Sequence, residues 1–133
     1  MSGGTGLRKP VFGKVKDLET GSRGVNLKVK VVSTEMKLER EKNGTKLRIG
    51  EAIAGDDTGI VTLTLRNEQI DVCAVGAPIV IRNGKVEMFK GHIRLEVDKW
   101  GKIVASEEAL EFEVNKENDV SATEYELVPV DER

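Results

Sequence analysis

Apolar and polar residues alternate at every second position in several short segments of this chain. In Val25–Glu35 the apolar members share one face and lysines and Asn26 occupy the other. The same period of two runs through Ile60–Arg66 and His92–Lys99. A period of two is typical of strands that have one buried and one solvated face. We therefore predict a strand in each segment.

The segment between the first two strands is highly charged. Met36–Lys46 is rich in Lys, Arg and Glu and contains Asn43-Gly44, a strong turn dipeptide. We predict a charged loop here, followed by a second strand over Lys46–Ala54. Three apolar residues of that strand should share one side: Leu47, Ile49 and Ile53. Gly55–Gly59, with its aspartates and glycines, predicts a sharp reversal into the third strand.

The third and fourth strands are separated by a helix signal. Asn67 can cap a short helix that runs to about Val75, because Gly76 and Pro78 follow and cannot continue it. The fourth strand is expected over Ile79–Phe89. Asn83-Gly84 within it predicts a bulge, since the alternation resumes with Val86 and Met88 facing inward. Lys90-Gly91 then turns the chain into the fifth strand.

This order of elements predicts an all-β fold. Five strands with a short helix between the third and fourth match the OB-fold, a Greek-key barrel that binds oligonucleotides across strands two and three and the flanking loops. Barrels with other topologies fit the strand pattern too, but the position of the helix favours the OB-fold.

The last thirty-one residues differ from the rest in charge. Residues 1–102 carry nineteen Lys/Arg and thirteen Asp/Glu, a net of +6, whereas residues 103–133 carry two and ten, a net of -8. Leu110–Val114 and Glu124–Val130 alternate, which predicts an acidic hairpin or extended arm, although the composition also suits a disordered tail. We divide the chain into a flexible N-terminus (1–10), an OB-fold domain (11–104) and an acidic C-terminal arm (105–133).

The composition excludes several functional classes. The single Cys73 and single His92 provide no zinc-ligand set, and no phosphate-binding loop or catalytic nucleophile motif is present. Asp56 and Asp57 precede Thr-Gly, which is what a tight turn requires. We expect no enzyme activity, no cofactor, no metal and no membrane segment. An intracellular protein is predicted, with the nuclear and cytoplasmic compartments both open.

Basic side chains and two aromatic rings, Phe89 and Trp100, are expected on the solvated side of the sheet, where they are suited to binding nucleic acid. Basic side chains neutralise phosphates and aromatic rings stack on bases. The candidate binding residues are Phe89, Arg66, Lys85, Lys90, Arg94, Trp100, Arg48, Lys46, Arg40 and Lys37. Two of these have structural alternatives: Phe89 could pack under the acidic arm or the first loop, and Trp100 could plug the end of the barrel.

Four short motifs carry a family resemblance: Val15-Lys16-Asp17-Leu18, Gly55–Gly59, Met88-Phe89-Lys90-Gly91 and Asp98-Lys99-Trp100-Gly101. The chain resembles single-domain OB proteins related to the single-stranded-DNA-binding component of the SOSS complex and to replication protein A, and is most similar to their plant and protist branch. The resemblance implies single-stranded-DNA binding through four aromatic platforms. Those platforms fall here at Arg66, Lys85, Phe89 and Glu96, so only Phe89 keeps its ring.

Two functions therefore follow from the sequence. The first is a single-stranded nucleic-acid-binding protein for DNA or RNA, which captures phosphates electrostatically and stacks bases on the open face of the barrel. The second is a protein-interaction module with little nucleic-acid affinity, in which the acidic arm docks a protein partner or a second copy. The first is favoured, although the second is supported by the low aromatic content, which is only 4% of the chain.

Overall fold

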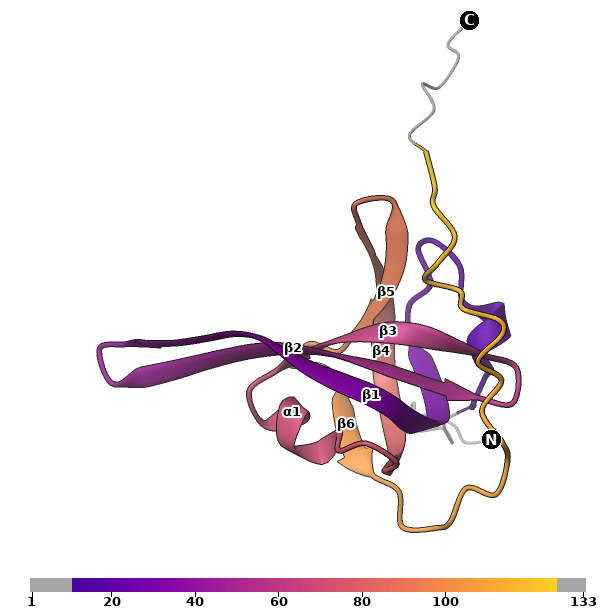
Figure 1. Ribbon diagram of the computed structural model, residues 1–133, viewed down its shortest axis with the longest axis horizontal. Helices are drawn as coiled ribbons and strands as arrows, with labels where there is room; N and C mark the ends of the chain where they lie inside the picture. The colour runs from indigo at the N-terminus through magenta and orange to yellow at the C-terminus, as the bar shows by residue number, and fades with distance from the viewer. Residues whose placement is uncertain (1–10, 127–133) are drawn as a thin grey trace, which may run out of the picture.

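The computed structural model describes residues 11–126 and forms a closed barrel (Figure 1). The barrel strands are β1 (Val25–Lys42), β2 (Thr45–Asp56), β3 (Gly59–Arg66), β4 (Pro78–Phe89) and β5 (His92–Glu96). They pair in the order β1-β2-β3-β5-β4, and β4 pairs again with β1. The β3–β5 pairing is parallel and all others are antiparallel. The predicted OB-fold is confirmed.

Alternation places the core as predicted in four of these strands. Buried apolar residues occupy every second position of β3, β5 and the first halves of β1 and β4, and include Leu27, Val29, Leu63, Leu65, Ile79, Ile81, Ile93 and Leu95. Burying a side chain of this size stabilises a fold by about 1.5–3 kcal/mol. The intervening polar residues are thereby held on the outer face.

In β2 the core is lined by small residues instead. Gly50, Ala52 and Ala54 are buried, whereas Ile49 and Ile53 are only half-buried on the opposite face. An added Cβ at Gly50 would lie 3.0 Å from the Glu35 carbonyl oxygen, so the backbones approach closely here. Leu47, Ile49 and Ile53 do share a side, but that side faces outward.

The charged segment between the first two strands is not a loop. β1 continues to Lys42 and β2 begins at Thr45, so the two strands form a long hairpin that projects from the barrel in Figure 1. Asn43 and Gly44 have φ of 54° and 78°, as a two-residue hairpin turn requires. The predicted turn is confirmed, and the predicted loop is wrong. Charged side chains do not prevent pairing when both faces are solvated.

The helix α1 (Glu68–Val72) is shorter than predicted. Asn67 has φ of 52° and makes no capping bond; instead its side-chain oxygen accepts a hydrogen bond from the Arg48 amide at 3.0 Å. Cys73 follows the helix and is fully buried in the core. Burial raises the pKa of its thiol to about 11, so the residue is a packing group rather than a reactive thiol.

A sixth strand extends the sheet beyond the five that the sequence predicts. β5 ends at Glu96 rather than Lys99, and after a turn β6 (Lys102–Ala105) pairs with the first half of β4. Asn83 has φ of 58°, and the pairing of β4 with β1 shifts register beside it, which confirms the bulge. The short 3-10 helix η1 (Val15–Asp17) contacts β3 and buries Val15 in the core.

The acidic segment folds onto the barrel as an arm. Residues 106–126 contain no named strand, so an acidic hairpin is absent from the described part of the chain, and residues 127–130 lie outside it. The arm follows the outside of β1 and the β2–β3 turn, where the Asn115 amide donates to the Asp56 carbonyl at 2.9 Å. It ends beside the β4–β5 turn, where the Tyr125 amide donates to the Gly91 carbonyl at 2.6 Å.

Two sequence-based expectations concern the ends of the chain and the membrane. The N-terminus expected to be flexible, residues 1–10, lies outside the described residues. In residues 11–126, no helix is long and apolar enough to span a membrane.

Candidate nucleic-acid interface

A groove of about 570 Å³ lies on the outer face of the barrel, between the β1–β2 and β4–β5 hairpins. Strands β2, β3 and β5 form its floor, and the two hairpins form its sides. Its lining residues are Lys37, Ile49, Gly50, Glu51, Thr64, Arg66, Glu87, Met88, Phe89, Arg94 and Glu96. This is the face of an OB barrel that is suited to an oligonucleotide.

The register between β2, β3 and β5 places these side chains on one face of the sheet. Ile49 lies opposite Arg66 and Glu51 opposite Thr64 across β2 and β3, and Thr64 lies beside Glu96 of β5. Residues directly opposite each other in a sheet project from the same face. The outward face of β2 therefore joins the polar faces of β3 and β5 in one surface.

Four of the candidate binding residues meet in this groove: Lys37, Arg66, Phe89 and Arg94. Lys37 reaches it because β1 shifts register between Met36 and Leu38. Met88 also lines the groove and is 45% exposed, so the expectation that it faces inward is wrong.

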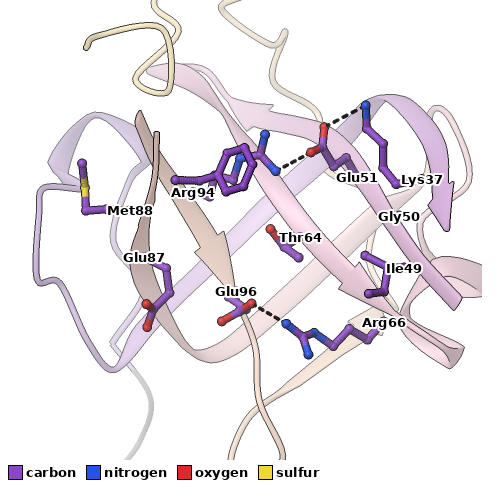
Figure 2. A pocket seen from close by; sticks show the side chains of 11 residues that line it. Lys37, Ile49, Gly50, Glu51, Thr64, Arg66, Glu87, Met88, Arg94 and Glu96 are labelled. Atoms are coloured by element: carbon purple, nitrogen blue, oxygen red, sulfur yellow. Dashed lines mark hydrogen bonds and ion pairs between the residues drawn. The ribbon is translucent and has the colours of Figure 1, made fainter. Parts of the chain in front are cut away.

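The cations of the groove are all paired with carboxylates (Figure 2). Glu51 accepts a hydrogen bond from Arg94 and forms a second ion pair with Lys37 at 3.9 Å. Across the floor, Arg66 bonds Glu96 at 3.0 Å. The groove is therefore polar but nearly neutral rather than cationic. A phosphate must displace a carboxylate to reach any of these three cations.

Phe89 provides an accessible ring at the end of the groove. Its side chain is 48% exposed, and the Arg94 guanidinium carbon lies 4.3 Å from the ring centroid. Lys90, in the β4–β5 turn, places its Nζ 5.3 Å from the same centroid. Both distances are typical of cation–π contacts. The expectation that Phe89 packs beneath the acidic arm or the first loop is not met.

The groove face continues onto the projecting hairpin. Leu38 lies opposite Ile49, Arg40 opposite Leu47, and Lys42 opposite Thr45. Because Ile49 lines the groove, the other members of these pairs project from the same side. We call Leu38, Arg40, Lys42 and Leu47 the hairpin face. Neither Arg40 nor Lys42 forms an ion pair within residues 11–126.

Lys46 and Arg48 project from the opposite side of the hairpin. Lys46 lies 3.7 Å from Glu39, and Arg48 bonds both carboxylate oxygens of Asp71 in α1 at 2.9 and 3.0 Å. The Arg48 hydrogen bonds hold the pKa of the Asp71 carboxyl below its usual value. These two candidates are separated from the groove and have acidic partners.

Lys85 and Trp100 also lie outside the groove. Lys85 forms ion pairs with Glu87 at 3.5 Å and Asp98 at 3.6 Å. Trp100 lies in the turn between β5 and β6 and is 71% exposed, so the expectation that it plugs the barrel is wrong.

The remaining polar residues serve the fold. Asp56 is buried and accepts hydrogen bonds from the Val15 amide at 3.0 Å and from Thr58. The His92 ring contacts the Ser121 carbonyl oxygen at 2.8 Å. The described residues contain no cluster of His, Cys, Asp and Glu that would hold a metal ion. The tight-turn interpretation of Gly55–Gly59 is supported.

Sequence reasoning missed the apolar and acidic members of the groove. It places Ile49 and Met88 in strands but does not predict that they line a solvent-exposed groove, and it assigns no role to Glu51 and Glu87. The alternation within Lys46–Ala54 contains a signal: placing Ala52 and Ala54 inside puts Glu51 beside Ile49 and Ile53. The pairing of Glu51 with Arg94 requires the three-dimensional arrangement.

Comparison with known proteins agrees with this geometry. Residues 18–105 match the family model described as "Single-stranded DNA binding protein Ssb-like, OB fold". The chain belongs to this family.

This Ssb-like chain is similar to both plant and archaeal proteins. It is 41% identical over 133 residues to an uncharacterised Arabidopsis thaliana protein, covering 92% of this chain and 86% of that one. The single-stranded DNA binding protein Ssb of Saccharolobus solfataricus is 34% identical over 96 residues, covering 71% and 64%.

The chain is also similar to solved structures of OB-fold proteins. The solution structure of a hypothetical Arabidopsis thaliana protein superposes with a TM-score of 0.77 at 39% identity, covering 99% of this chain and 97% of that one. The second OB-fold domain of replication protein A from Methanococcus maripaludis gives a TM-score of 0.57 at 26% identity, covering 76% and 100%.

Proposed function

We propose that this Ssb-like chain binds single-stranded nucleic acid, and single-stranded DNA in particular, in the groove and along the hairpin face. The main support for this proposal is that the two surfaces are continuous through Ile49, which pairs with Arg66 in β3 and with Leu38 in β1. Similarity to a protein named for single-stranded DNA binding supports DNA as the ligand.

In the proposed mechanism the first contacts are electrostatic. Arg40 and Lys42 on the hairpin, and Lys90 in the β4–β5 turn, have no ion pair within the described residues, so they can take phosphates without losing a carboxylate. Arg40 and Lys42 lie on the hairpin face that continues the groove, and Lys90 lies in the β4–β5 turn next to Phe89. Each phosphate neutralised on a single strand contributes about -0.7 to the dependence of log affinity on log salt. Three contacts give a slope near -2.

Bases then occupy the groove. Phe89 offers a ring for stacking, and the planar Arg66 and Arg94 guanidiniums can lie against further bases while they remain bonded to Glu96 and Glu51. Leu38, Leu47 and Ile49 add apolar contact along the hairpin. The groove thus uses stacking and apolar contact, whereas the β1–β2 hairpin and Lys90 supply the charge.

The ion-paired groove also supports a second candidate function. A nearly neutral surface with apolar Ile49 and half-exposed Met88 and Phe89 is suited to a protein partner as well. A protein-interaction module would show weak nucleic-acid binding with no preference for single strands. The two functions therefore differ in a direct titration.

The test is a fluorescence-anisotropy titration of labelled single-stranded DNA, single-stranded RNA and duplex DNA at about 50 and 200 mM salt. We expect single strands to bind more tightly than duplex, with the slope given above. Phe89→Ala should weaken binding roughly 5- to 150-fold, since stacking contributes about 1–3 kcal/mol per base.

Val75→Ala is the matched control, because Val75 is an exposed apolar side chain outside the groove. It should bind like the wild type. Folded protein that binds none of the three ligands, or binds duplex as well as single strands, would contradict the proposal and favour the protein-interaction module.

A further inference from the structure

Trp100 is a large, exposed aromatic side chain that does not line the groove. It lies in the β5–β6 turn and is 71% exposed. The turn itself is firmly held: the Trp100 amide donates to Asp98 Oδ1 at 2.8 Å, and its carbonyl accepts from Asn83 Nδ2 at 2.9 Å. A Cβ at Gly101 would lie 2.4 Å from the Arg82 carbonyl oxygen, so the turn is pressed against β4. A rigid backbone thus presents an exposed indole.

One basic side chain contacts this ring, and two more lie on the neighbouring strands. Lys99 Nζ lies 5.2 Å from the Trp100 centroid, and Arg82 and Lys102 lie opposite each other across β4 and β6. None of these three cations forms an ion pair within residues 11–126. We call Arg82, Lys99, Trp100 and Lys102 the Trp100 patch.

Within residues 11–126, the acidic residues nearby form no ion pair with the patch. Asp98 bonds the Trp100 amide and pairs with Lys85. Glu107 and Glu108 line a hollow together with Arg82 and Lys102, but Glu108 is bonded to Lys28 at 3.0 Å. The Trp100 patch therefore combines a stacking ring with unpaired cations, a combination suited to a base and its flanking phosphates.

The patch continues from one end of the groove. Glu96 lines the groove and lies opposite Lys85 across β4 and β5. Lys85 in turn lies 3.6 Å from Asp98, whose carboxylate holds the Trp100 turn. A strand that leaves the groove past Arg66 and Glu96 thus reaches the patch next.

We propose that the Trp100 patch is a second contact for the single strand, in which the indole stacks on a base outside the groove and the cations bind adjacent phosphates. This inference rests on the proposed function. OB-folds occupy about 4–16 nucleotides. An oligonucleotide of about five nucleotides would fill the groove alone, whereas one of about fifteen would also reach the patch.

The single tryptophan of the chain makes the test direct. Intrinsic fluorescence and the anisotropy of labelled oligonucleotides of about five and about fifteen nucleotides are followed in parallel with the full chain. We expect the long oligonucleotide to quench Trp100 and the short one to leave its emission unchanged. Trp100→Ala should weaken long-oligonucleotide binding about tenfold, to near the affinity of the short one, and Trp100→Phe should restore most of it.

The outcomes separate the two proposals. If neither oligonucleotide changes the anisotropy, the proposed function fails. If both bind but the long one leaves the emission unchanged, or Trp100→Ala binds the long one like the wild type, the second contact is overturned while the groove remains. The patch would then be available to a protein instead. Val75→Ala, an exposed apolar change outside both the groove and the hollow that Arg82 and Lys102 line, is the matched control and should leave both affinities unchanged.

Discussion

At the scale of single residues, the electrostatics of the groove depend on two carboxylates. Glu51 pairs with Arg94 and Lys37, and Glu96 pairs with Arg66. Both glutamates occupy positions at which a phosphate would otherwise contact the same cations. Removing one carboxylate should therefore increase the attraction for a polyanion.

Glu51→Gln should tighten single-strand binding, because it releases Arg94 from its carboxylate while keeping a side chain of the same shape. Lys37 loses one of its two ion pairs and stays paired with Glu35 at 3.3 Å. Each released cation can add up to about 0.7 to the magnitude of the salt slope. We expect roughly 3- to 20-fold tighter binding at low salt, measured by anisotropy.

Glu39→Gln removes the same charge from the other side of the hairpin, where Glu39 pairs with Lys46. It serves as the control and should have a smaller effect. Equal affinities of Glu51→Gln and Glu39→Gln would show that the charge of the groove has no effect on binding, which would contradict the placement of the strand in the groove.

At the scale of elements, the acidic arm is part of the barrel wall. β3 and β5 pair only at Leu63–Leu95 and Thr64–Glu96. Beyond these pairs Ser121 bridges the two strands: its Oγ donates to the Ile93 carbonyl at 2.7 Å and accepts from the Thr62 amide at 3.0 Å. A chain truncated near Val104 would lose these bonds, so truncation would change the barrel as well as the charge.

Ser121→Ala should destabilise the fold. Ser121 is only 7% exposed, and the substitution leaves the Ile93 carbonyl and the Thr62 amide without their partner. Loss of such buried bonds costs about 1–3 kcal/mol. Denaturant unfolding followed by circular dichroism measures the change in the free energy of unfolding.

Ser106→Ala is the matched control, since the Ser106 hydroxyl bonds the Glu108 carbonyl at an exposed site. It should lower the free energy of unfolding by much less. Equal stabilities of the two variants would show that the arm does not hold the β3–β5 edge.

At the scale of the whole molecule, opposite charges lie on different surfaces. The arm occupies the lysines of the first half of β1: Lys28 forms an ion pair with Glu108, and Lys30 Nζ donates a hydrogen bond to the Phe112 carbonyl at 2.6 Å. None of the residues that line the groove comes from the arm. The basic charge that remains accessible is concentrated on the hairpin face and the Trp100 patch.

The sequence predicts the barrel better than it predicts the groove. Alternation of apolar and polar residues, as in Val61-Thr62-Leu63, indicates directly which side chains are buried. The strands and their order along the chain can therefore be predicted. Met36–Lys46 resembles a loop because its alternation involves charged residues on both faces, which carries no burial signal. Two features depend on the register between strands, which no local sequence pattern contains. They are the placement of Arg40 and Lys46 on opposite faces of the hairpin and the ion pair between Glu51 and Arg94.

The central claim is that the groove and the hairpin face form one continuous surface for a single strand. Two double variants test it most directly: Arg40→Ala with Lys42→Ala on the hairpin face, and Lys46→Ala with Arg48→Ala on the opposite side. Each removes two positive charges from the same hairpin. Circular dichroism should first establish that both are folded, because Arg48 also bonds Asp71.

Salt-dependent anisotropy titration with single-stranded DNA is the deciding measurement. We expect the first double variant to bind about tenfold more weakly and its salt slope to fall in magnitude by about 1.4, at about 0.7 per phosphate. The second should stay within about twofold of the wild type with an unchanged slope. Equal losses of affinity in the two variants would contradict a single-sided binding surface and leave only a general effect of net charge.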